Sequence, residues 1–318
     1  MSELEVYLGI DTSCYTTSVA FMDRQANLVG ESRQILKVHE GKCGLQQSEM
    51  VFQHTRNLPE MITNAMPRGA KIIGVCASGY PRPLPDSYMP AFLVGAGLAR
   101  SVSVLNNIPL WLISHQENHL LAGKWSAGGP DDERFLFLHA SGGTTDLLTA
   151  EKDGSGSYKL TEIGGSIDLH AGQFIDRIGV SLGLQFPAGP ALEKFAGAAA
   201  GPVELPVSVK GCKASLSGPA TAAERKLAAG EDPAGIALGV QKVLAETFYR
   251  LIYNACSEYN TKSVLIAGGV ASNTYIREYL HNKLTGRKIS LWHPQARFSC
   301  DNASGCAAFA VLKGEKSV

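Results

Sequence analysis

The sequence lacks a surplus of charge of either sign. Lys and Arg together number 29, and so do Asp and Glu. The chain as a whole therefore does not carry the basic surplus that is typical of a stand-alone nucleic-acid binder. Any contact with nucleic acid must be local or shared with a partner. Lys210, Lys213, Arg225 and Lys226 form a local basic patch of this kind, although we slightly prefer to interpret them as part of a solvated loop.

The sequence also lacks paired cysteines and long apolar runs. Its seven cysteines are scattered, and none belongs to a CxxC pair, which argues against a disulfide framework and against a zinc ribbon. The first residues do not combine a basic start with an apolar core, and no apolar run reaches the roughly 18 to 20 residues of a spanning helix. We therefore expect a cytoplasmic protein.

A repeated pattern of strand, polar turn and strand is present. Residues 5–10 and 17–22 read as buried strands around the turn Asp11-Thr-Ser13, and residues 135–140 and 147–150 repeat the arrangement around Ser141-Gly-Gly-Thr-Thr-Asp146. This repeated pattern predicts a duplicated fold with one phosphate-binding hairpin in each half. A length of 318 residues suits two moderate cores.

Helical periodicity and turn residues complete the expected organisation. We expect helices at 48–65, 91–105 and 234–259, and a further helix that is capped by Ser114. Residues 197–230, rich in Ala, Gly, Pro and Lys, are expected to form an irregular insertion. The turn-rich segment 128–132 predicts a boundary between an N-terminal lobe at 1–127 and a C-terminal lobe at 128–299. Residues 300–318 are expected to form a helix that packs back on the first lobe.

His115 and His119 lie four residues apart, so both imidazoles occupy one face of a helix, as a shared metal ion requires. Taken alone, the spacing fits ordinary capping or packing histidines better than a metal site. Asp301 is our candidate for a third ligand from elsewhere in the fold. Two nitrogens and one carboxylate suit zinc or ferrous iron and leave positions open for a substrate oxygen.

Two glycine turns allow a close approach of backbone N–H groups to an anion. They are Ser141-Gly142-Gly143-Thr144-Thr145 and Gly268-Gly-Val-Ala-Ser-Asn273. Each turn, taken singly, is better explained as a tight connection between elements. Together with the hydroxyl turn near the N-terminus, they favour a bound nucleotide.

Two carboxylates flank Gly172 in a segment that could reach one ligand. Asp168 and Asp176 are spaced so that both can hydrogen-bond ribose hydroxyls, and solvated helix-face acids are the equal alternative. Gly189, in a Pro-Ala-Gly-Pro turn, could approach a base or sugar, but a structural turn is the stronger interpretation.

Taken in order, these segments resemble the tRNA threonylcarbamoyladenosine transferase family, formerly described as O-sialoglycoprotein endopeptidases. The resemblance is collinear over nearly the whole chain. It comprises Gly9-Ile-Asp-Thr-Ser-Cys14, Val94-Gly95 to Arg100, His115 to Leu120, Ser141-Gly-Gly, Asp168 to Asp176, Leu182-Gly to Gly189-Pro190, Gly268 to Asn273 and Asp301-Asn302. Eight weak motifs in one order are far more specific than any single motif.

The resemblance implies a two-lobed α/β fold of the actin/Hsp70/sugar-kinase class, with nucleotide and metal in the cleft between the lobes. It implies His115, His119 and Asp301 as ligands of one divalent metal, Fe²⁺ or Zn²⁺. The nucleotide, as ATP, AMP or threonylcarbamoyl-AMP and with or without Mg²⁺, is expected near Ser141, Gly142, Gly143, Thr144, Asp168, Gly172, Asp176, Gly189 and Asn273. We assign catalysis to Asp11, Ser13 and Ser141.

The implied reaction transfers threonylcarbamoyl from its adenylate to N6 of adenosine 37 in tRNAs that read ANN codons. The expected partners are tRNA and either a second actin-fold subunit or another copy of the chain, bound through the N-terminal lobe.

Several positions depart from the family pattern. Tyr15 and Thr16 stand where the family carries acidic residues, Thr144 replaces a histidine, and Gln173 replaces a glutamate. In addition, Leu216-Ser-Gly-Pro-Ala220 lacks the family's lysine, and Tyr80-Pro-Arg-Pro-Leu-Pro85 replaces a glycine-rich turn. These changes indicate a divergent paralogue.

We weigh four functions. A carbamoyl transferase is preferred, followed by a nucleotide- and metal-binding paralogue that acts as a scaffold or regulator. Carbamoylation of a small molecule and phosphotransfer take a smaller share, and they stay open because actin-like lobes host both and the fold alone does not decide the function. A zinc protease is disfavoured, because His115 is not followed by the glutamate of a His-Glu-x-x-His site.

Overall fold

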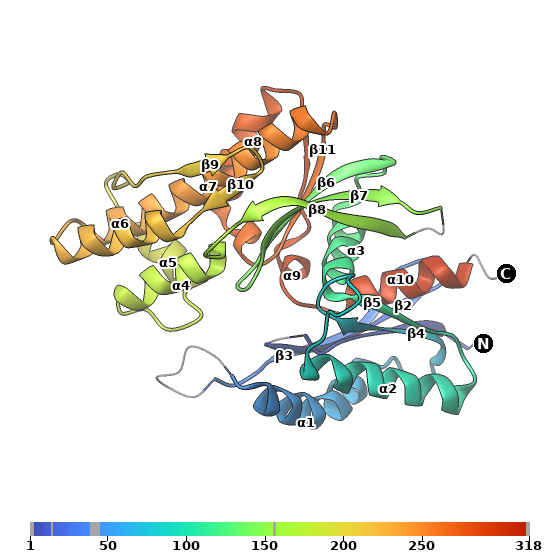
Figure 1. Ribbon diagram of the computed structural model, residues 1–318. Helices are drawn as coiled ribbons and strands as arrows, with labels where there is room; N and C mark the ends of the chain where they lie inside the picture. Colours follow the sequence, from blue (N-terminus) through green and yellow to red (C-terminus); the bar gives the residue numbers. More distant parts are fainter. Residues whose placement is uncertain (1–2, 14, 39–44, 155–156, 316–318) are drawn as a thin grey trace. The chain divides into compact units, whose positions relative to one another are not determined.

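The chain folds into two compact units, which are described separately (Figure 1). The structure is a computed structural model that describes residues 3–13, 15–38, 45–154 and 157–315. Unit 1 comprises Met1–Gly128, Lys152–Tyr158 and Asp301–Val318. Unit 2 comprises Gly129–Glu151 and Lys159–Cys300.

Unit 1 is built on a five-stranded sheet with the order β3-β2-β1-β4-β5. Strands β1, β2 and β3 pair antiparallel, whereas β4 and β5 continue the sheet in parallel from β1. The elements are β1 Glu5–Asp11, β2 Thr16–Asp23, β3 Leu28–Ile35, α1 Gln47–Ala65, β4 Lys71–Tyr80, α2 Pro90–Asn106, β5 Leu110–Ser114, α3 His115–Ala127 and α10 Ser304–Gly314.

Helices cover both faces of the unit 1 sheet. Helices α1 and α2 lie on one face, and α3 and α10 lie on the other (Figure 1). Helix α1 buries Met50, His54, Leu58, Met61 and Ala65, which recur at helical spacing and explain why this segment folds as an amphipathic helix. Strand β1 is covered on both sides, which agrees with its nearly continuous burial.

The C-terminal helix α10 makes unusually close backbone contacts within unit 1. A Cβ atom on Gly9 of β1 would lie 2.3 Å from the carbonyl oxygen of Ala303, and one on Gly305 would lie 2.0 Å from the carbonyl oxygen of Asn118. Only glycine permits these approaches. The two glycines therefore seat the start of α10 between β1 and α3, which places Asp301 beside α3.

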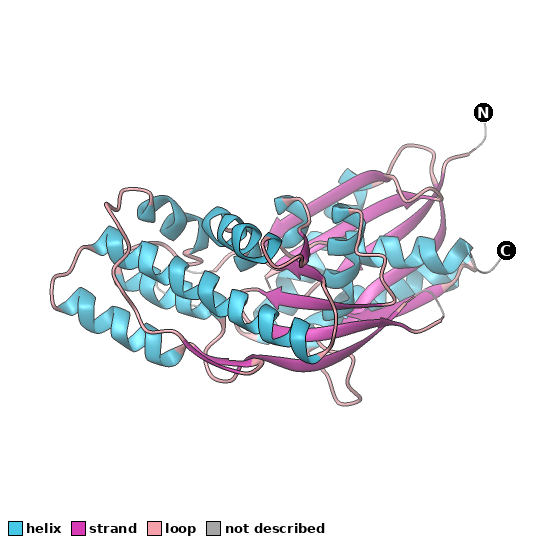
Figure 2. Cartoon of the chain, turned by 90° about the horizontal axis from the view of Figure 1, so that it is seen from above, coloured by secondary structure: helices cyan, strands magenta, loops and turns pink. Residues whose placement is uncertain are grey.

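Unit 2 is built on a seven-stranded sheet with the order β12-β11-β6-β7-β8-β10-β9. The elements are β6 Arg134–Ala140, β7 Thr145–Lys152, β8 Tyr158–Ser166, α4 Ala171–Ser181, α5 Gly189–Ala196, β9 Ser208–Lys210, β10 Lys213–Ser215, α6 Ser217–Ala228, α7 Pro233–Glu258, β11 Ser263–Ala267, the 3-10 turn η1 Val270–Ser272, α8 Thr274–Thr285, β12 Ser290–Trp292 and α9 Ala296–Ser299. Figure 2 shows that long helices accompany the strands.

The two sheets share one strand plan. Read from its antiparallel hairpin, unit 2 has the order β8-β7-β6-β11-β12, in which β6 and β7 are antiparallel and β6, β11 and β12 are parallel. This order matches β3-β2-β1-β4-β5 of unit 1. The predicted duplication is therefore present in the structure, with the turns after β1 and β6 in equivalent positions.

The prediction of an irregular insertion at 197–230 is wrong. This segment contains the hairpin of β9 and β10 and the helix α6. Gly211, with φ of 58°, makes the tight turn of the hairpin, and Ala220 and Ala223 bury the inner face of α6. Its small residues form a packed helix because alanine favours helices and fits close packing.

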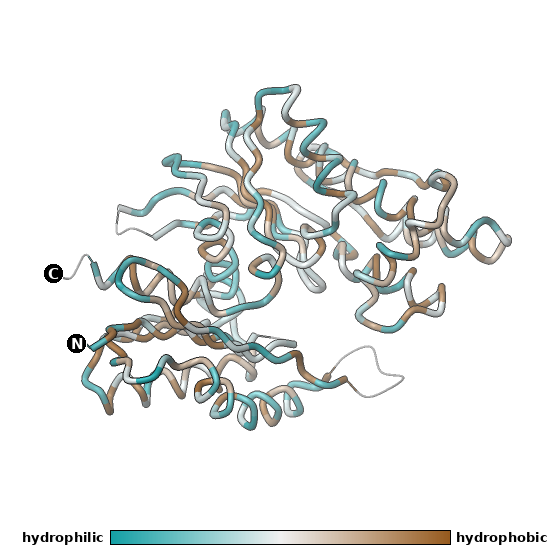
Figure 3. The backbone as a smooth tube through the Cα atoms, turned by 180° about the vertical axis from the view of Figure 1, so that it is seen from behind, coloured by the Kyte–Doolittle hydropathy of each residue, from teal (hydrophilic) through white to brown (hydrophobic). Residues whose placement is uncertain are grey.

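Apolar residues are frequent along the strands, as the hydropathy colouring of Figure 3 shows, and the buried residues of the helices are mainly apolar. The five described cysteines carry free thiols. None of the described helices combines the length and the apolar character that crossing a bilayer requires.

Candidate metal centre and nucleotide-binding turns

The histidine pair sits at a firmly capped helix start. Ser114 ends β5 and caps α3, since its hydroxyl accepts from the Glu117 N–H at 3.1 Å and the Glu117 carboxylate accepts from the Ser114 N–H at 2.7 Å. This reciprocal arrangement is a capping box. It fixes where the helix begins, so His115 occupies the first helical position and His119 lies one turn later on the same face.

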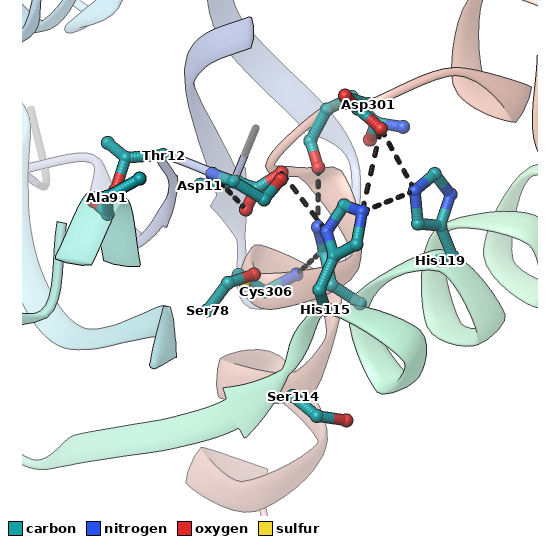
Figure 4. Close-up of polar contacts among 12 residues, drawn as sticks. Asp11, Thr12, Ser78, Ala91, Ser114, His115, His119, Asp301 and Cys306 are labelled. Carbon is teal, nitrogen blue, oxygen red and sulfur yellow. Dashed lines mark hydrogen bonds and ion pairs between the residues drawn. The ribbon is translucent and has the colours of Figure 1, made fainter. Parts of the chain in front are cut away.

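His115, His119 and Asp301 converge on one point of unit 1 (Figure 4). The Nε2 atoms of the two histidines are 3.1 Å apart. Asp301 Oδ1 lies 3.1 Å from Nε2 of His119 and 3.6 Å from Nε2 of His115. The segment before Asp301 is the short helix α9, Ala296–Ser299.

These spacings fit a single ion. Donor atoms that lie about 2.0 to 2.2 Å from a tetrahedral ion stand about 3.3 to 3.6 Å from one another. The three donor–donor distances of 3.1, 3.1 and 3.6 Å scatter around this value. The residues present therefore have the geometry and the donor chemistry of a His₂-carboxylate metal site.

Asparagine side chains hold the two halves of this site together. Asn118 Nδ2 donates to the Asn302 carbonyl oxygen at 2.7 Å, and the Cys306 N–H donates to Asn118 Oδ1 at 2.9 Å. The Asn302 side chain in turn accepts from the Ser304 N–H at 2.9 Å. Both asparagines are buried. These bonds tie α3 to the residues that follow Asp301.

Asp11 stands behind His115 in the arrangement of a supporting carboxylate. Its Oδ2 lies 3.8 Å from Nδ1 of His115, on the side of the ring away from Asp301. The Ser13 hydroxyl donates to the same oxygen at 2.8 Å. A carboxylate that faces Nδ1 favours the tautomer in which Nε2 keeps its lone pair for an ion. Asp11, predicted catalytic, thus faces His115, and Ser13, also predicted catalytic, hydrogen-bonds Asp11.

The charges of the centre are coupled. Burial lowers the pKa of His115, but the carboxylates of Asp11 and Asp301 outweigh it and raise this pKa above its ordinary value. Burial and the neighbouring His115 lower the pKa of His119. Burial alone would raise the pKa of Asp301, yet the two histidines hold that pKa below its usual range. A negative carboxylate beside a neutral His119 suits cation binding.

The positions where the family pattern has acids serve packing in this chain. Tyr15 packs against Leu36, Met50 and Ala91 in a small apolar cluster, and Thr16 begins β2 as a buried residue. Cys14 lies outside the described residues. Neither Tyr15 nor Thr16 supplies a carboxylate to the centre.

In unit 2, the glycine turn after β6 is shaped by a close contact with α4. The Ser141 N–H donates to the Thr144 carbonyl at 2.8 Å, and the Gly172 N–H donates to the Ser141 carbonyl at 3.2 Å. A Cβ on Gly172 would lie 2.4 Å from Gly142 Cα. By contrast, Cβ atoms on Gly142 and Gly143 would meet only open space. The turn therefore presents exposed backbone that a ligand can approach.

The carboxylate of Asp168 is held by hydrogen bonds from other residues of unit 2. It accepts from Ser215 Oγ at 2.6 Å, from the Leu216 N–H at 2.9 Å and from Ser217 Oγ. Partial burial raises the pKa of Asp168, but these hydrogen bonds outweigh it and hold that pKa well below its usual range. The residue anchors the start of α6 to the end of β8.

The remaining predicted nucleotide residues lie on separate elements of unit 2. Asp176 Oδ1 accepts from the Ala188 N–H at 2.7 Å, next to Gly189 at the start of α5, and burial raises the pKa of Asp176. Asn273 caps α8 by accepting from the Ile276 N–H at 3.0 Å and donates to Gln241 of α7. Gln173 accepts from the His170 N–H at 3.0 Å and so closes the start of α4.

The role of Asn118 was not predicted from the sequence. It lies between the two histidines, but a buried amide leaves no periodic signal, and its partners are more than 180 positions away in the chain. The pairing of Asp11 with His115 was also missed, because only the fold brings the end of β1 beside α3.

Comparison with known proteins identifies the relatives of this chain. A family model described as TsaD: tRNA N6-adenosine threonylcarbamoyltransferase matches residues 88–308. The chain belongs to this family. The tRNA N6-adenosine threonylcarbamoyltransferase of Nitrosomonas eutropha is 28% identical over 316 residues, which cover 96% of this chain and 91% of the relative. That of Methanopyrus kandleri is 28% identical and covers 86% of this chain and 77% of its own length.

A longer relative is also similar. A probable bifunctional tRNA threonylcarbamoyladenosine biosynthesis protein of Methanothermobacter thermautotrophicus is 26% identical, and the match covers 96% of this chain and 55% of the relative. The resemblance that the motifs indicated is therefore confirmed, and the identities agree with a divergent member.

Solved structures support the fold class. Component A of the (R)-2-hydroxyglutaryl-CoA dehydratase of Acidaminococcus fermentans matches with a TM-score of 0.57 at 17% identity and covers 98% of this chain and 99% of its own. A glucokinase of the ROK family from Streptomyces griseus matches with a TM-score of 0.53 at 12% identity, and the match covers 98% of this chain and 99% of the glucokinase chain. The predicted α/β fold of the actin/Hsp70/sugar-kinase class is confirmed.

Proposed function

We propose that the protein is a metal-dependent transferase that moves threonylcarbamoyl from its adenylate to N6 of adenosine 37 in tRNA. One observation carries the proposal most strongly. His115 Nε2, His119 Nε2 and Asp301 Oδ1 lie 3.1 to 3.6 Å from one another, and Asp11 stands behind His115. The relatives named as tRNA N6-adenosine threonylcarbamoyltransferases support the choice of reaction.

The ligand set favours zinc or ferrous iron over magnesium, because two imidazole nitrogens suit these softer ions. A bound ion of this kind supplies Lewis-acid polarisation of a carbonyl or phosphoryl oxygen. His115, His119 and Asp301 would hold it through three donors. Three protein donors leave coordination positions for substrate, as in catalytic metal sites.

The chemistry that the protein must support is an acyl transfer. The N6 nitrogen forms a bond to the carbonyl carbon of the carbamoyl group, and the bond from that carbon to the adenylate phosphate oxygen breaks. AMP departs with the electron pair, and N6 loses one proton to the solvent. In this scheme, Asp11 and Ser13 position His115, and the Asn118–Asn302 contact positions Asp301.

Unit 2 supplies the nucleotide-binding part of the proposal. The exposed backbone of Gly142 and Gly143 would donate N–H groups to the adenylate phosphate, where negative charge increases as AMP leaves. Asp176, whose pKa is raised by burial, would accept from a ribose hydroxyl with its second carboxylate oxygen. Asp168 supports α6 in this scheme.

Transfer to tRNA tests the proposal directly. Purified protein is incubated with threonylcarbamoyl adenylate and an unmodified tRNA transcript, and digested nucleosides are analysed by mass spectrometry. The wild type should yield threonylcarbamoyladenosine, and His119→Ala should reduce the yield at least about 100-fold. His281→Ala, which removes an exposed histidine of α8, is the matched control. A wild type that binds metal but leaves the transcript unmodified contradicts the proposal.

A second function is favoured by one observation. Tyr15 and Thr16 pack into unit 1 where the family pattern has acids, and Gln173 stands where it has a glutamate. A paralogue that binds metal and nucleotide as a scaffold would tolerate these losses. It would bind nucleotide with micromolar affinity and give no product in the transfer assay.

A further inference from the structure

Helices α7 and α8 of unit 2 lie against each other (Figure 1). Each helix carries two tyrosines at this contact. Tyr249 and Tyr253 are one turn apart on α7, with ring centroids at 5.9 Å and an angle of 28° between the rings. Tyr275 and Tyr279 are one turn apart on α8, with centroids at 6.3 Å and an angle of 22°. The two near-parallel pairs form one aromatic surface.

Two exposed cations lie over these rings. Lys283 Nζ is 5.9 Å from the ring centroid of Tyr249 and 5.5 Å from that of Tyr279. Arg287 Cζ is 5.1 Å from the centroids of both Tyr249 and Tyr253. The spacing of Tyr275, Tyr279, Lys283 and Arg287 by four residues aligns them along α8 and its end. We call these six residues the tyrosine–cation face.

The face keeps its positive charge. Among the described residues, neither Lys283 nor Arg287 forms an ion pair with a carboxylate, whereas Arg177 and Lys242 of the same unit each pair with a glutamate at 2.5 Å. Glu246, the carboxylate at the edge of the face, is bound by Arg250 at 2.6 Å and accepts from the Tyr279 hydroxyl at 2.5 Å. Lys283 interacts with Glu246 electrostatically but does not form an ion-pair contact with it. The local surplus is notable in a chain with equal numbers of cations and anions.

We propose that the tyrosine–cation face binds RNA, with Lys283 and Arg287 at phosphates and with unpaired bases stacked on Tyr253 and on the Arg287 guanidinium. Cations that lack carboxylate partners are available for phosphates, whose neutralisation releases counterions. Tyr253 is 44% exposed and offers a ring face to a base. Arg287 lies over the rings of Tyr249 and Tyr253, and a guanidinium offers a plane on which a base can stack.

An acidic polypeptide is the competing occupant, because Tyr and Arg are also enriched in protein interfaces. The choice of RNA rests on the proposed function, since a protein that modifies tRNA must hold it. None of the six residues belongs to the metal centre or to the glycine turns, so the face adds a binding surface to them.

RNA binding is measured by fluorescence anisotropy with a labelled anticodon stem-loop, full-length protein, no acyl donor, and increasing potassium chloride. The double variant Lys283→Gln/Arg287→Gln should bind the stem-loop at least about tenfold more weakly. The slope of log affinity against log salt concentration should also become shallower by about 1.4, because each of the two lost phosphate contacts contributes about 0.7 to that slope. The control Lys194→Gln/Lys262→Gln removes two exposed charges elsewhere on unit 2 and should bind as the wild type does.

The aromatic contribution is tested separately. Tyr253→Ala should weaken binding at least about fivefold, and Tyr253→Phe, which keeps the ring, should restore it. The inference is overturned if the two double variants bind alike, or if the wild type binds polyglutamate and not the stem-loop. A protein that binds RNA through this face but fails to transfer threonylcarbamoyl would overturn the proposed function and leave this inference standing.

Discussion

The side chain of Asn118 donates a hydrogen bond to the backbone carbonyl of Asn302 at 2.7 Å, and both residues are buried. This bond joins the helix that carries His115 and His119 to the residue that follows Asp301. The geometry of the candidate metal centre therefore depends on a contact between residues that are not ligands.

Replacement of this contact should affect both stability and metal binding. In Asn118→Ala, the Asn302 carbonyl and the Cys306 N–H lose their buried partner, which should cost about 1 to 3 kcal/mol in the free energy of unfolding. Metal affinity should fall about 10- to 100-fold. Urea unfolding and metal titration measure the two effects. Asn254→Ala, which removes a side-chain bond to the Gly211 carbonyl of unit 2, should leave metal affinity unchanged.

The close approach of α10 to α3 predicts a strong effect of one methyl group. In Gly305→Ala, the new Cβ would lie 2.0 Å from the Asn118 carbonyl oxygen, so α10 must shift, at a cost of about 3 kcal/mol. Gly218→Ala is the matched helical control, because its Cβ meets open space, and it should stabilise the protein by up to about 1 kcal/mol. Equal thermal unfolding temperatures for the two variants would contradict this packing.

The nucleotide proposal makes different demands on two neighbouring glycines. Gly143→Ala adds a Cβ that meets nothing in the protein, so stability should be retained, but nucleotide affinity should fall about tenfold. Gly172→Ala should reduce stability as well, because its Cβ would press on Gly142. Calorimetry with AMP and urea unfolding separate the two outcomes. Unchanged affinity in Gly143→Ala would show that the turn does not contact the phosphate.

Asp168 predicts a pH dependence of stability. Its folded-state pKa is lowered from the ordinary value of 3.8, so the ionised form contributes stability that is present above pH 3.8 and is lost as the pH falls toward the folded-state pKa. Asp168→Asn should therefore be less stable than wild type at pH 7, and the difference should narrow below pH 3.8. Urea unfolding at several pH values tests this, with exposed Asp86→Asn as the control. A constant difference would contradict the assignment.

Much of the fold could be predicted because it rests on local patterns. Helix α7 was expected at 234–259 and is found at Pro233–Glu258, since its apolar residues recur at helical spacing. The hairpins β1–β2 and β6–β7 were recognisable as apolar runs around polar turns. The composition of residues 197–230 led to the wrong prediction of an irregular insertion, because this Ala- and Gly-rich segment forms the packed helix α6 and a hairpin.

The metal centre was only partly accessible from sequence. The four-residue spacing placed His115 and His119 on one helical face, and the capping box confirmed where that helix begins. Asp301 lies 182 positions from His119, so periodicity could not join them. The sequence offered Asp301 as a candidate third ligand, and the resemblance implied the same residue. The contacts of Asn118 and Asp11 depend on how α10 and β1 pack, which the sequence does not show locally.

Metal content tests the central claim most directly. The purified wild type is analysed by elemental analysis beside His119→Ala and the exposed-histidine control His281→Ala. The wild type and the control should each contain about one zinc or iron ion per chain, and His119→Ala should lose that ion. Equal metal content in His119→Ala and the wild type, or a wild type that takes up no zinc or iron when supplied with it, would contradict the assignment of the site to His115, His119 and Asp301.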